Sequence, residues 1–372
     1  MAKHLLRSTA RHKMSCIQII LRSHHEAVKI PLYPHSLKLK DVSISGVGTR
    51  AMCTSSLPSS WYHKYQFQQK SVLDGATDIE CTVSVIDTHH GATDKPIVLG
   101  IHGLLGQGED FEPLISKLHK RGIRVVAPTF PGFQGSSLEP WQLNHLDFTT
   151  QGRALILKII LDTVGIHRVD MLLTHSAGSW LCYKLLAEWD IFRSAGFLSP
   201  VGVNPHRIIR PHFTVKAMST LLRVQTLQPV TLSLISRLYR SLGFAGAQAG
   251  TDVAASQHLL AGPEFHNIPN HVEEIRRKKI PLFIAHTIKD KIVELEIPLE
   301  VITKHLLIPQ QNIVHYDDNS VPSKDPFQGF IDDWLVRVLF FERGGHIVHR
   351  PHCDIIIEQI MSILQHINHT SS

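Results

Sequence analysis

Cysteine pairs and long apolar runs are both missing from this sequence of 372 residues. The five cysteines, at positions 16, 53, 81, 182 and 353, form no CxxC pair and are odd in number. That pattern argues against a disulfide framework and fits a reducing compartment. No apolar run approaches the length of a membrane-spanning helix. The hydrophobic content of 43% is nevertheless ample for a sizeable core.

Metal-binding motifs are also missing, although the 26 histidines are unusually many. No HExxH or similar zinc spacing occurs. His346, His349 and His352 recur at three-residue steps, but Arg350 and Pro351 interrupt any helix that would align them. We therefore expect neither a metal ion nor an organic cofactor.

Acidic residues are absent before Glu26, where five basic residues are interspersed with apolar ones. This start resembles a mitochondrial presequence more than a secretory signal, whose apolar core would be longer. A mitochondrial location is the expectation, and a plain disordered extension of a cytoplasmic protein is the alternative. Residues 43–60 are rich in Ser, Gly and Thr and are typical of a linker. Residues 1–60 are thus predicted to precede the folded region.

A second stretch without acid runs between Asp190 and Asp252. It carries seven basic residues, and its strand rhythm stops at about residue 204. Residues 204–278 instead show helical spacing, with one predicted stripe formed by Leu234, Ile235, Leu238, Tyr239 and Leu242. We expect a helical insertion that covers the site as a lid. Its charge could steer an anionic substrate or contact an anionic membrane surface, and an ordinary solvated helix surface is the alternative.

The insertion also supplies the candidate residues for substrate binding. His206, Arg207 and Arg210 are closest in sequence to the edge of the predicted sheet. Nucleic acid is not an expected partner, because no recognition motif appears. The expected partner is a small ester or acyl substrate, and the sequence does not indicate the oligomeric state.

The rest of the chain alternates strands and helices. Two strands at 65–73 and 80–88 flank the turn at Asp74-Gly75. Buried strands are then predicted at 96–101, 124–130, 169–173, 195–203, 279–289 and 334–341, and helices at 110–120, 149–165, after 178 and from 354. This alternation specifies an α/β fold with a mostly parallel sheet and helices on both faces. The predicted core comprises residues 65–203 and 279–369.

The most informative stretch is Arg168 to Gly178, R-V-D-M-L-L-T-H-S-A-G. A short apolar strand ends at Thr174-His175-Ser176-Ala177-Gly178, and an apolar helical pattern follows at once. Strand, serine turn and helix form the context of a nucleophile elbow, in which the serine hydroxyl points away from the sheet. The positions two before and two after the serine must be small, and Thr174 meets that condition only roughly.

Three further signatures occur in the appropriate order. They are His102-Gly103-Leu104-Leu105-Gly106, Pro131-Gly132-Phe133 and Gly344-Gly345-His346. With the elbow, they make residues 65–368 resemble the α/β-hydrolase fold. The stretch from Asn204 to Pro211 is also similar to a poorly characterised animal family of such hydrolases, best known from nematodes, whose substrate is unknown.

The resemblance implies a catalytic triad in the order serine, acid, histidine. These roles fall on Ser176, Asp290 and His346, with Asp317 or Asp318 as the alternative acid. The backbone N–H groups of Leu104 and Ala177 would hold the oxyanion. Two residues depart from the family pattern: Thr174 replaces the usual glycine, and Thr129 stands where many relatives have aspartate.

These assignments predict a serine hydrolase that cleaves a carboxylic ester or thioester through an acyl-enzyme on Ser176. The apolar lid favours a lipid-like acyl group. The alternative is a non-catalytic protein that keeps the fold and binds a ligand or partner in the lidded pocket; Thr174 is the feature that favours it.

Overall fold

The computed structural model describes residues 40–41, 56–134, 138, 141–244, 247 and 250–370. The predicted presequence and residues 43–55 of the predicted linker lie outside the described residues. The mitochondrial location therefore stays a prediction. Within the described part of the chain, no helix has both the length and the apolar character needed to cross a membrane.

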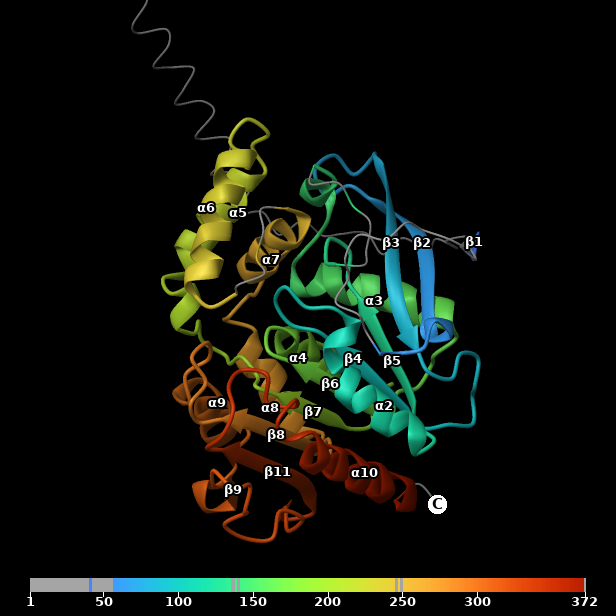
Figure 1. The fold of residues 1–372 in the computed structure, drawn as a ribbon, viewed down its shortest axis with the longest axis vertical. Coiled ribbons are helices and arrows are strands. Elements are labelled where there is room, and N and C mark those ends of the chain that lie inside the picture. The colour runs from blue at the N-terminus through green and yellow to red at the C-terminus, as the bar shows by residue number, and fades with distance from the viewer. Residues whose placement is uncertain are drawn as a thin grey trace, which may run out of the picture. The chain divides into compact units, whose positions relative to one another are not determined.

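A single mostly parallel sheet forms the centre of the fold (Figure 1). Its strands follow the order β1-β2-β3-β5-β4-β6-β7-β8-β11-β10, and β9 pairs with β11 on a branch from this order. The pairs from β5 to β11 and the β9–β11 pair are parallel, whereas β1–β2, β2–β3, β3–β5 and β10–β11 are antiparallel. The bounds are β1 Lys40–Asp41, β2 Tyr62–Lys70, β3 Asp78–Asp87, β4 Ile97–Ile101, β5 Arg124–Thr129, β6 Met171–His175, β7 Ala195–Leu198, β8 Leu282–Thr287, β9 Ile313–Tyr316, β10 Phe330–Ile331 and β11 Trp334–Phe341.

The predicted strands correspond to observed ones, several with bounds shifted by a few residues. The strand expected at 195–203 ends at Leu198, and the sequence analysis does not predict the short strands β1, β9 and β10. The turn expected at Asp74-Gly75 is present, because the Asp74 carboxylate accepts hydrogen bonds from the backbone N–H groups of Ala76 and Thr77.

Helices cover both faces of the sheet (Figure 1). One buried cluster joins α3, α4 and α8 to the sheet, and a second cluster joins α2 and α10 to it. Capping explains one set of boundaries, since the Thr149 hydroxyl accepts from the Gly152 N–H at the start of α3 and Gly165 ends it in the left-handed region. The bounds are α2 Glu112–Lys120, α3 Thr150–Val164, α4 Gly178–Glu188, α8 Ile268–Arg277, α9 Glu296–Glu300 and α10 Cys353–His369.

The predicted insertion, residues 204–278, contains α5 His212–Leu222, α6 Gln228–Ser241 and α7 Thr251–Ala261, and its last helix is α8, which packs in the same buried cluster as the sheet. The predicted stripe lies on α6 and is partly buried and partly exposed. Ile235 and Tyr239 are buried, whereas Leu234 and Leu238 are 57% and 51% exposed. The apolar arc of α6 is wider than the surface it packs against, so its outer edge stays exposed.

Parallel strands place their carboxyl ends at one edge of the sheet, where ligands bind in open α/β folds. β4, β6, β8 and β11 are all parallel, and each is followed by a loop that carries predicted site residues. Leu104 follows β4, Ser176 follows β6, Asp290 follows β8 and His346 follows β11. The topology therefore gathers residues that are up to 242 positions apart in sequence (346 minus 104).

Candidate active site

Ser176 occupies a tight turn between β6 and α4. Its φ of 52° lies in the left-handed region, which is costly for a residue with a side chain. A Cβ at Gly178 would approach Thr174 Oγ1 to 2.6 Å and the Ile101 carbonyl oxygen to 2.7 Å. The absence of a side chain at Gly178 thus leaves the room that the threonine two residues before the serine requires. The Thr174 departure is accommodated locally.

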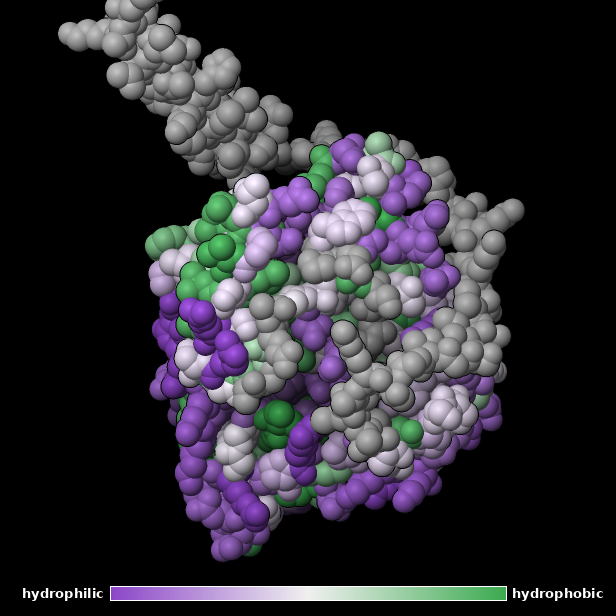
Figure 2. All heavy atoms as spheres, turned by 45° about the horizontal axis from the view of Figure 1, so that its top comes forward, coloured by the Kyte–Doolittle hydropathy of each residue, from purple (hydrophilic) through white to green (hydrophobic). Residues whose placement is uncertain are grey.

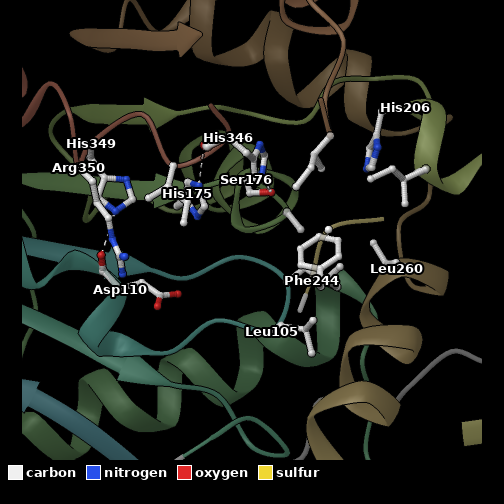
Figure 3. A pocket seen from close by; sticks show the side chains of 16 residues that line it. Leu105, Asp110, His175, Ser176, His206, Phe244, Leu260, His346, His349 and Arg350 are labelled. Atoms are coloured by element: carbon white, nitrogen blue, oxygen red, sulfur yellow. Dashed lines mark hydrogen bonds between the residues drawn. The ribbon is translucent and has the colours of Figure 1, made fainter. Parts of the chain in front are cut away.

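Ser176, His346 and Asp290 form one hydrogen-bonded chain (Figure 3 shows Ser176 and His346). The Ser176 Oγ lies 2.7 Å from His346 Nε2, and His346 Nδ1 lies 2.7 Å from Asp290 Oδ2. The Asp290 carboxylate can only accept, so Nδ1 carries the proton of a neutral imidazole and Nε2 accepts from the serine hydroxyl. This tautomer leaves His346 ready to take the serine proton.

The Asp290 carboxylate is held in place from both sides. Its side chain is buried, and Oδ1 accepts from the backbone N–H groups of Ile292 at 2.8 Å and Val293 at 3.2 Å. Burial raises the pKa of this carboxyl, but the bonds from His346 and the backbone outweigh burial, so the pKa lies below its ordinary value. Asp290 therefore remains an anion beside the imidazole.

The two alternative acids have other partners. The Asp317 carboxylate accepts from the backbone N–H groups of Asn319 and Val321, which stabilises its own turn. Asp318 pairs with Lys289 at 3.4 Å. The geometry thus joins His346 to Asp290 and to neither of these aspartates.

The loop after β4 passes directly over the serine. A Cβ at Gly103 would lie 2.9 Å from the Ser176 Cβ, so only glycine permits this approach. His102 fixes the start of the loop, because its Nδ1–H donates to the Gly103 carbonyl and its Nε2 accepts from the Phe130 N–H. Leu104 and Ala177, the predicted oxyanion residues, both line the cavity at Ser176.

A cavity of about 410 Å³ opens at Ser176 (Figure 3). Its volume lies within the usual range for small-molecule sites. The loops after β4 and β11 and the helical insertion all contribute to its wall. Most of the lining is apolar, with Leu104, Leu105, Ala177, Ile208, Phe244, Leu260, Ile292 and Ile347, and the polar side chains beside the triad residues are Asp110, His175, His206, His349 and Arg350.

Of the three predicted substrate anchors, only His206 lines the cavity. Its ring is buried, and burial lowers its pKa to about 4, so it is a neutral hydrogen-bonding group at physiological pH. Arg207 and Arg210 instead form ion pairs with Glu294 and are not among the lining residues. The structure therefore does not bring these two arginines to the site.

Two histidines that the sequence analysis does not assign to the site contact the loop that carries His346. His175 Nε2–H donates to the His346 carbonyl oxygen over 3.2 Å, and its ring lies 5.2 Å from that of His349. His349 in turn donates to the Asp110 carbonyl oxygen at 2.9 Å. The signal for His175 was its position immediately before the elbow serine. Because Ser176 is hydrogen-bonded to His346, the residue before it also lies near the loop of His346.

The rings of the histidines at 346, 349 and 352 do not converge on one point where a metal ion could bind. Each ring has a different hydrogen-bond partner, namely Ser176 and Asp290 for the first, Asp110 for the second and Arg343 for the third. In the part of the chain that the structure describes, no group of three His, Cys, Asp or Glu side chains is arranged to hold a metal ion.

Comparison with known sequences gives two matches. A family model described as "Alpha/beta hydrolase of unknown function (DUF1057)" matches residues 61–365. An uncharacterized protein of Caenorhabditis elegans is 21% identical over 305 residues, which cover 78% of this chain and 83% of the relative. The resemblance to a nematode family noted in the sequence is thus supported by a nematode relative.

Solved structures show the same fold at low identity. A thermophilic esterase from Thermogutta terrifontis has a TM-score of 0.53 at 14% identity and covers 81% of this chain and 98% of its own. A putative lipase from Acinetobacter baumannii has a TM-score of 0.52 at 15% identity, covering 82% and 92%. The enol-lactonase from Burkholderia xenovorans has a TM-score of 0.51 at 13% identity, covering 80% and 99%.

Proposed function

The chain belongs to this family of alpha/beta hydrolases, and on that premise we propose that it is a serine hydrolase acting on a carboxylic ester or thioester. The observation that carries the proposal is the continuous chain of hydrogen bonds from Ser176 through His346 to the buried Asp290. Each of these side chains follows a strand of the same sheet edge, and their order matches that of the fold.

The reaction proceeds through an acyl-enzyme. Ser176 Oγ attacks the substrate carbonyl carbon while His346 Nε2 takes its proton. His346 then gives that proton to the leaving oxygen or sulfur as the bond to the carbonyl breaks, which leaves the acyl group on Ser176. A water molecule, deprotonated by His346, hydrolyses this ester and restores the serine. Asp290 holds the imidazole in its tautomer and stabilises the imidazolium in both steps.

Negative charge that develops on the carbonyl oxygen needs a preorganised donor. The backbone N–H groups of Leu104 and Ala177 are our candidates, because both residues line the cavity at Ser176 and belong to the two loops that meet there. One such donor is worth about 3–4 kcal/mol of transition-state stabilisation in enzymes where it has been removed.

The cavity wall favours a lipid-like acyl group. Its lining is mainly aliphatic, with one aromatic side chain, Phe244, contributed by the helical insertion. We assign the insertion the role of a lid, since Ile208, Phe244 and Leu260 all reach the cavity from it. Burying apolar chain against these residues would contribute binding energy of roughly 25 cal/mol per Å².

Labelling by a fluorophosphonate probe tests the nucleophile. The wild-type protein should label rapidly, Ser176→Ala should not label, and His346→Ala should label very slowly. Ser179→Ala is the matched control, because Ser179 is buried on the first turn of α4 and its hydroxyl has no hydrogen-bond partner among the described residues, so this variant should label like the wild type. Labelling of Ser176→Ala at the wild-type rate would exclude Ser176 as the nucleophile.

A screen of esters and thioesters of increasing acyl length then tests the substrate class. We expect kcat/KM to rise with chain length until the cavity is full. If well-folded wild-type protein neither labels nor hydrolyses any member, the non-catalytic ligand-binding alternative is the better description. The lack of a side chain at Gly178 leaves room for Thr174, which supports the hydrolase over that alternative.

A further inference from the structure

The helical insertion exposes a concentrated set of large apolar side chains. Val230, Leu234 and Leu238 follow one another at four-residue steps and form a line along the outer side of α6, with exposures of 73%, 57% and 51%. Phe213 on α5 is 72% exposed, and the set is completed by Leu221, Val224 and Leu227. We call these seven residues the α5–α6 face, and Figure 2 shows apolar side chains gathered over this end of the molecule.

Packing within the insertion does not explain this face. The opposite sides of the two helices already supply the buried contacts, through Val215 and Leu222 on α5 and Leu232, Ile235 and Tyr239 on α6. Exposed apolar sets of this size on soluble proteins mark surfaces that contact a partner or a membrane.

The charge around the face has one sign. No acidic residue occurs between Asp190 and Asp252, while Lys216, Arg237 and Arg240 are exposed on α5 and α6. Arg237 lies within the apolar line of α6, one residue before Leu238 and three after Leu234. An apolar line bordered by cations is the pattern of helices that lie in the interface of an anionic bilayer.

The same charge pattern argues against a second copy of the chain as the occupant. A twofold contact through this face would bring Lys216, Arg237 and Arg240 of each copy near their counterparts, and the face has no acid of its own to pair with them. An anionic lipid surface supplies both the apolar layer and the negative charge that the face lacks.

The chain segments next to α5 and α6 also line the cavity. Ile208, four residues before α5, and Phe244, three residues after α6, both line the cavity. Ile347, from the loop of His346, is 42% exposed and also lines it. The segments that lead into α5 and out of α6 therefore form part of the cavity wall.

We propose that the α5–α6 face docks the protein peripherally on an anionic lipid bilayer, with its apolar side chains in the interface and its arginines on the headgroups. Docking by this face holds the cavity next to the bilayer. The proposal concerns binding alone, so it is independent of the chemistry at Ser176.

Co-flotation of the full chain with vesicles measures the docking. Vesicles of equal parts phosphatidylcholine and phosphatidylserine should bind the wild type, and phosphatidylcholine vesicles should bind it more weakly. Leu234→Ser combined with Leu238→Ser should lower the partition coefficient at least about tenfold, since two apolar chains leave the interface. Arg237→Gln combined with Arg240→Gln should lower it about fivefold for each arginine and should weaken its dependence on salt.

Val72→Ser combined with Leu73→Ser is the matched control. These residues are 50% and 58% exposed at the β2–β3 turn, so the change removes similar apolar surface elsewhere. It should leave vesicle binding unchanged. Equal loss in the control and in the Leu234 and Leu238 variant, or no loss in either, would overturn the proposal.

A tryptophan placed on the face locates the contact independently of any loss of binding. On the phosphatidylserine vesicles, Leu234→Trp should add fluorescence emission that is blue-shifted and that a brominated lipid quenches. The emission added by Leu73→Trp should be neither blue-shifted nor quenched. Identical responses from the two tryptophans would overturn the proposal. So would a wild-type dimer that Leu234→Ser with Leu238→Ser converts to a monomer, because a second copy would then be the occupant.

Discussion

The site around Ser176 and the α5–α6 face differ in how their charges are paired and how far their apolar side chains are exposed. Around Ser176, the serine and Asp290 are buried, and the Asp290 carboxylate is bound by a ring nitrogen and two backbone N–H groups. On the α5–α6 face, aliphatic side chains up to 73% exposed stand among cations without an acid. The insertion's own packing needs neither the exposed chains nor the one-sided charge.

The difference indicates which constraints act on each region. A buried carboxylate must be paired, since an unpaired one would lose its charge or destabilise the fold. An exposed leucine costs the folded state little, so its presence in a line of similar residues points to a contact outside the chain. The first region is explained by contacts within the molecule, whereas packing among the described residues does not explain the second.

The largest effect should come from the buried acid. Asp290→Asn should slow fluorophosphonate labelling by about 10⁴-fold, because the amide cannot hold the imidazole in the required tautomer or stabilise its cation. Asp317→Asn is the paired control, and it should change the rate by no more than about twofold, as expected for a residue outside the site. Equal slowing in both variants would contradict the assignment of Asp290.

Lowering the pH should decrease the free energy of unfolding through buried histidines near the site, and it should leave the arginines beside the α5–α6 face charged. Burial lowers the pKa of His102 to about 3, against an ordinary value of 6.5, and both its ring nitrogens are already hydrogen-bonded in the neutral form. A lowered folded pKa means that the unfolded chain binds the proton first. This contribution to stability is therefore complete above pH 6.5 and is lost as the pH falls from there toward 3.

Urea unfolding between pH 7.5 and 5 measures this loss. The free energy of unfolding should decrease with falling pH in the wild type, and the decrease should be smaller in His102→Gln, whose amide does not titrate. An identical decrease in both proteins would show that other groups account for the pH dependence. The arginines of the α5–α6 face do not titrate in this range, so the salt dependence of vesicle binding should persist.

A matched pair of truncations separates packing from exposure. Ile356→Ala, at a fully buried position of α10, should lower the free energy of unfolding by about 2–5 kcal/mol through lost burial and a cavity. Leu234→Ala should change it by no more than about 0.5 kcal/mol, since the side chain is 57% exposed. A large loss from Leu234→Ala would mean that this face packs against other parts of the chain, contrary to the docking proposal.

The smallest effect should come from the arginines that pair with Glu294. Arg207→Gln combined with Arg210→Gln should change the rate of fluorophosphonate labelling by less than about twofold, because neither arginine lines the cavity and half-exposed ion pairs contribute little. A drop of tenfold or more would restore the original prediction that these arginines anchor the substrate.

The sequence was sufficient to predict the fold and the order of the site. Strand and helix periods repeat in residues 65–203 and 279–369, and each signature marks the end of a strand. A parallel sheet then brings those ends to one edge, whatever the detailed packing. That is why Ser176, Asp290 and His346 could be placed together before any distance was known.

Tertiary packing decided the remaining features. The α6 sequence predicts a wide apolar arc, but only the neighbouring helices determine that Ile235 is buried and Leu234 exposed. The position of Glu294, 84 residues beyond Arg210, likewise determines that this arginine forms an ion pair outside the cavity. Local periodicity follows from the geometry of the backbone, whereas burial and pairing depend on residues far away in sequence, which the pattern around a residue does not contain.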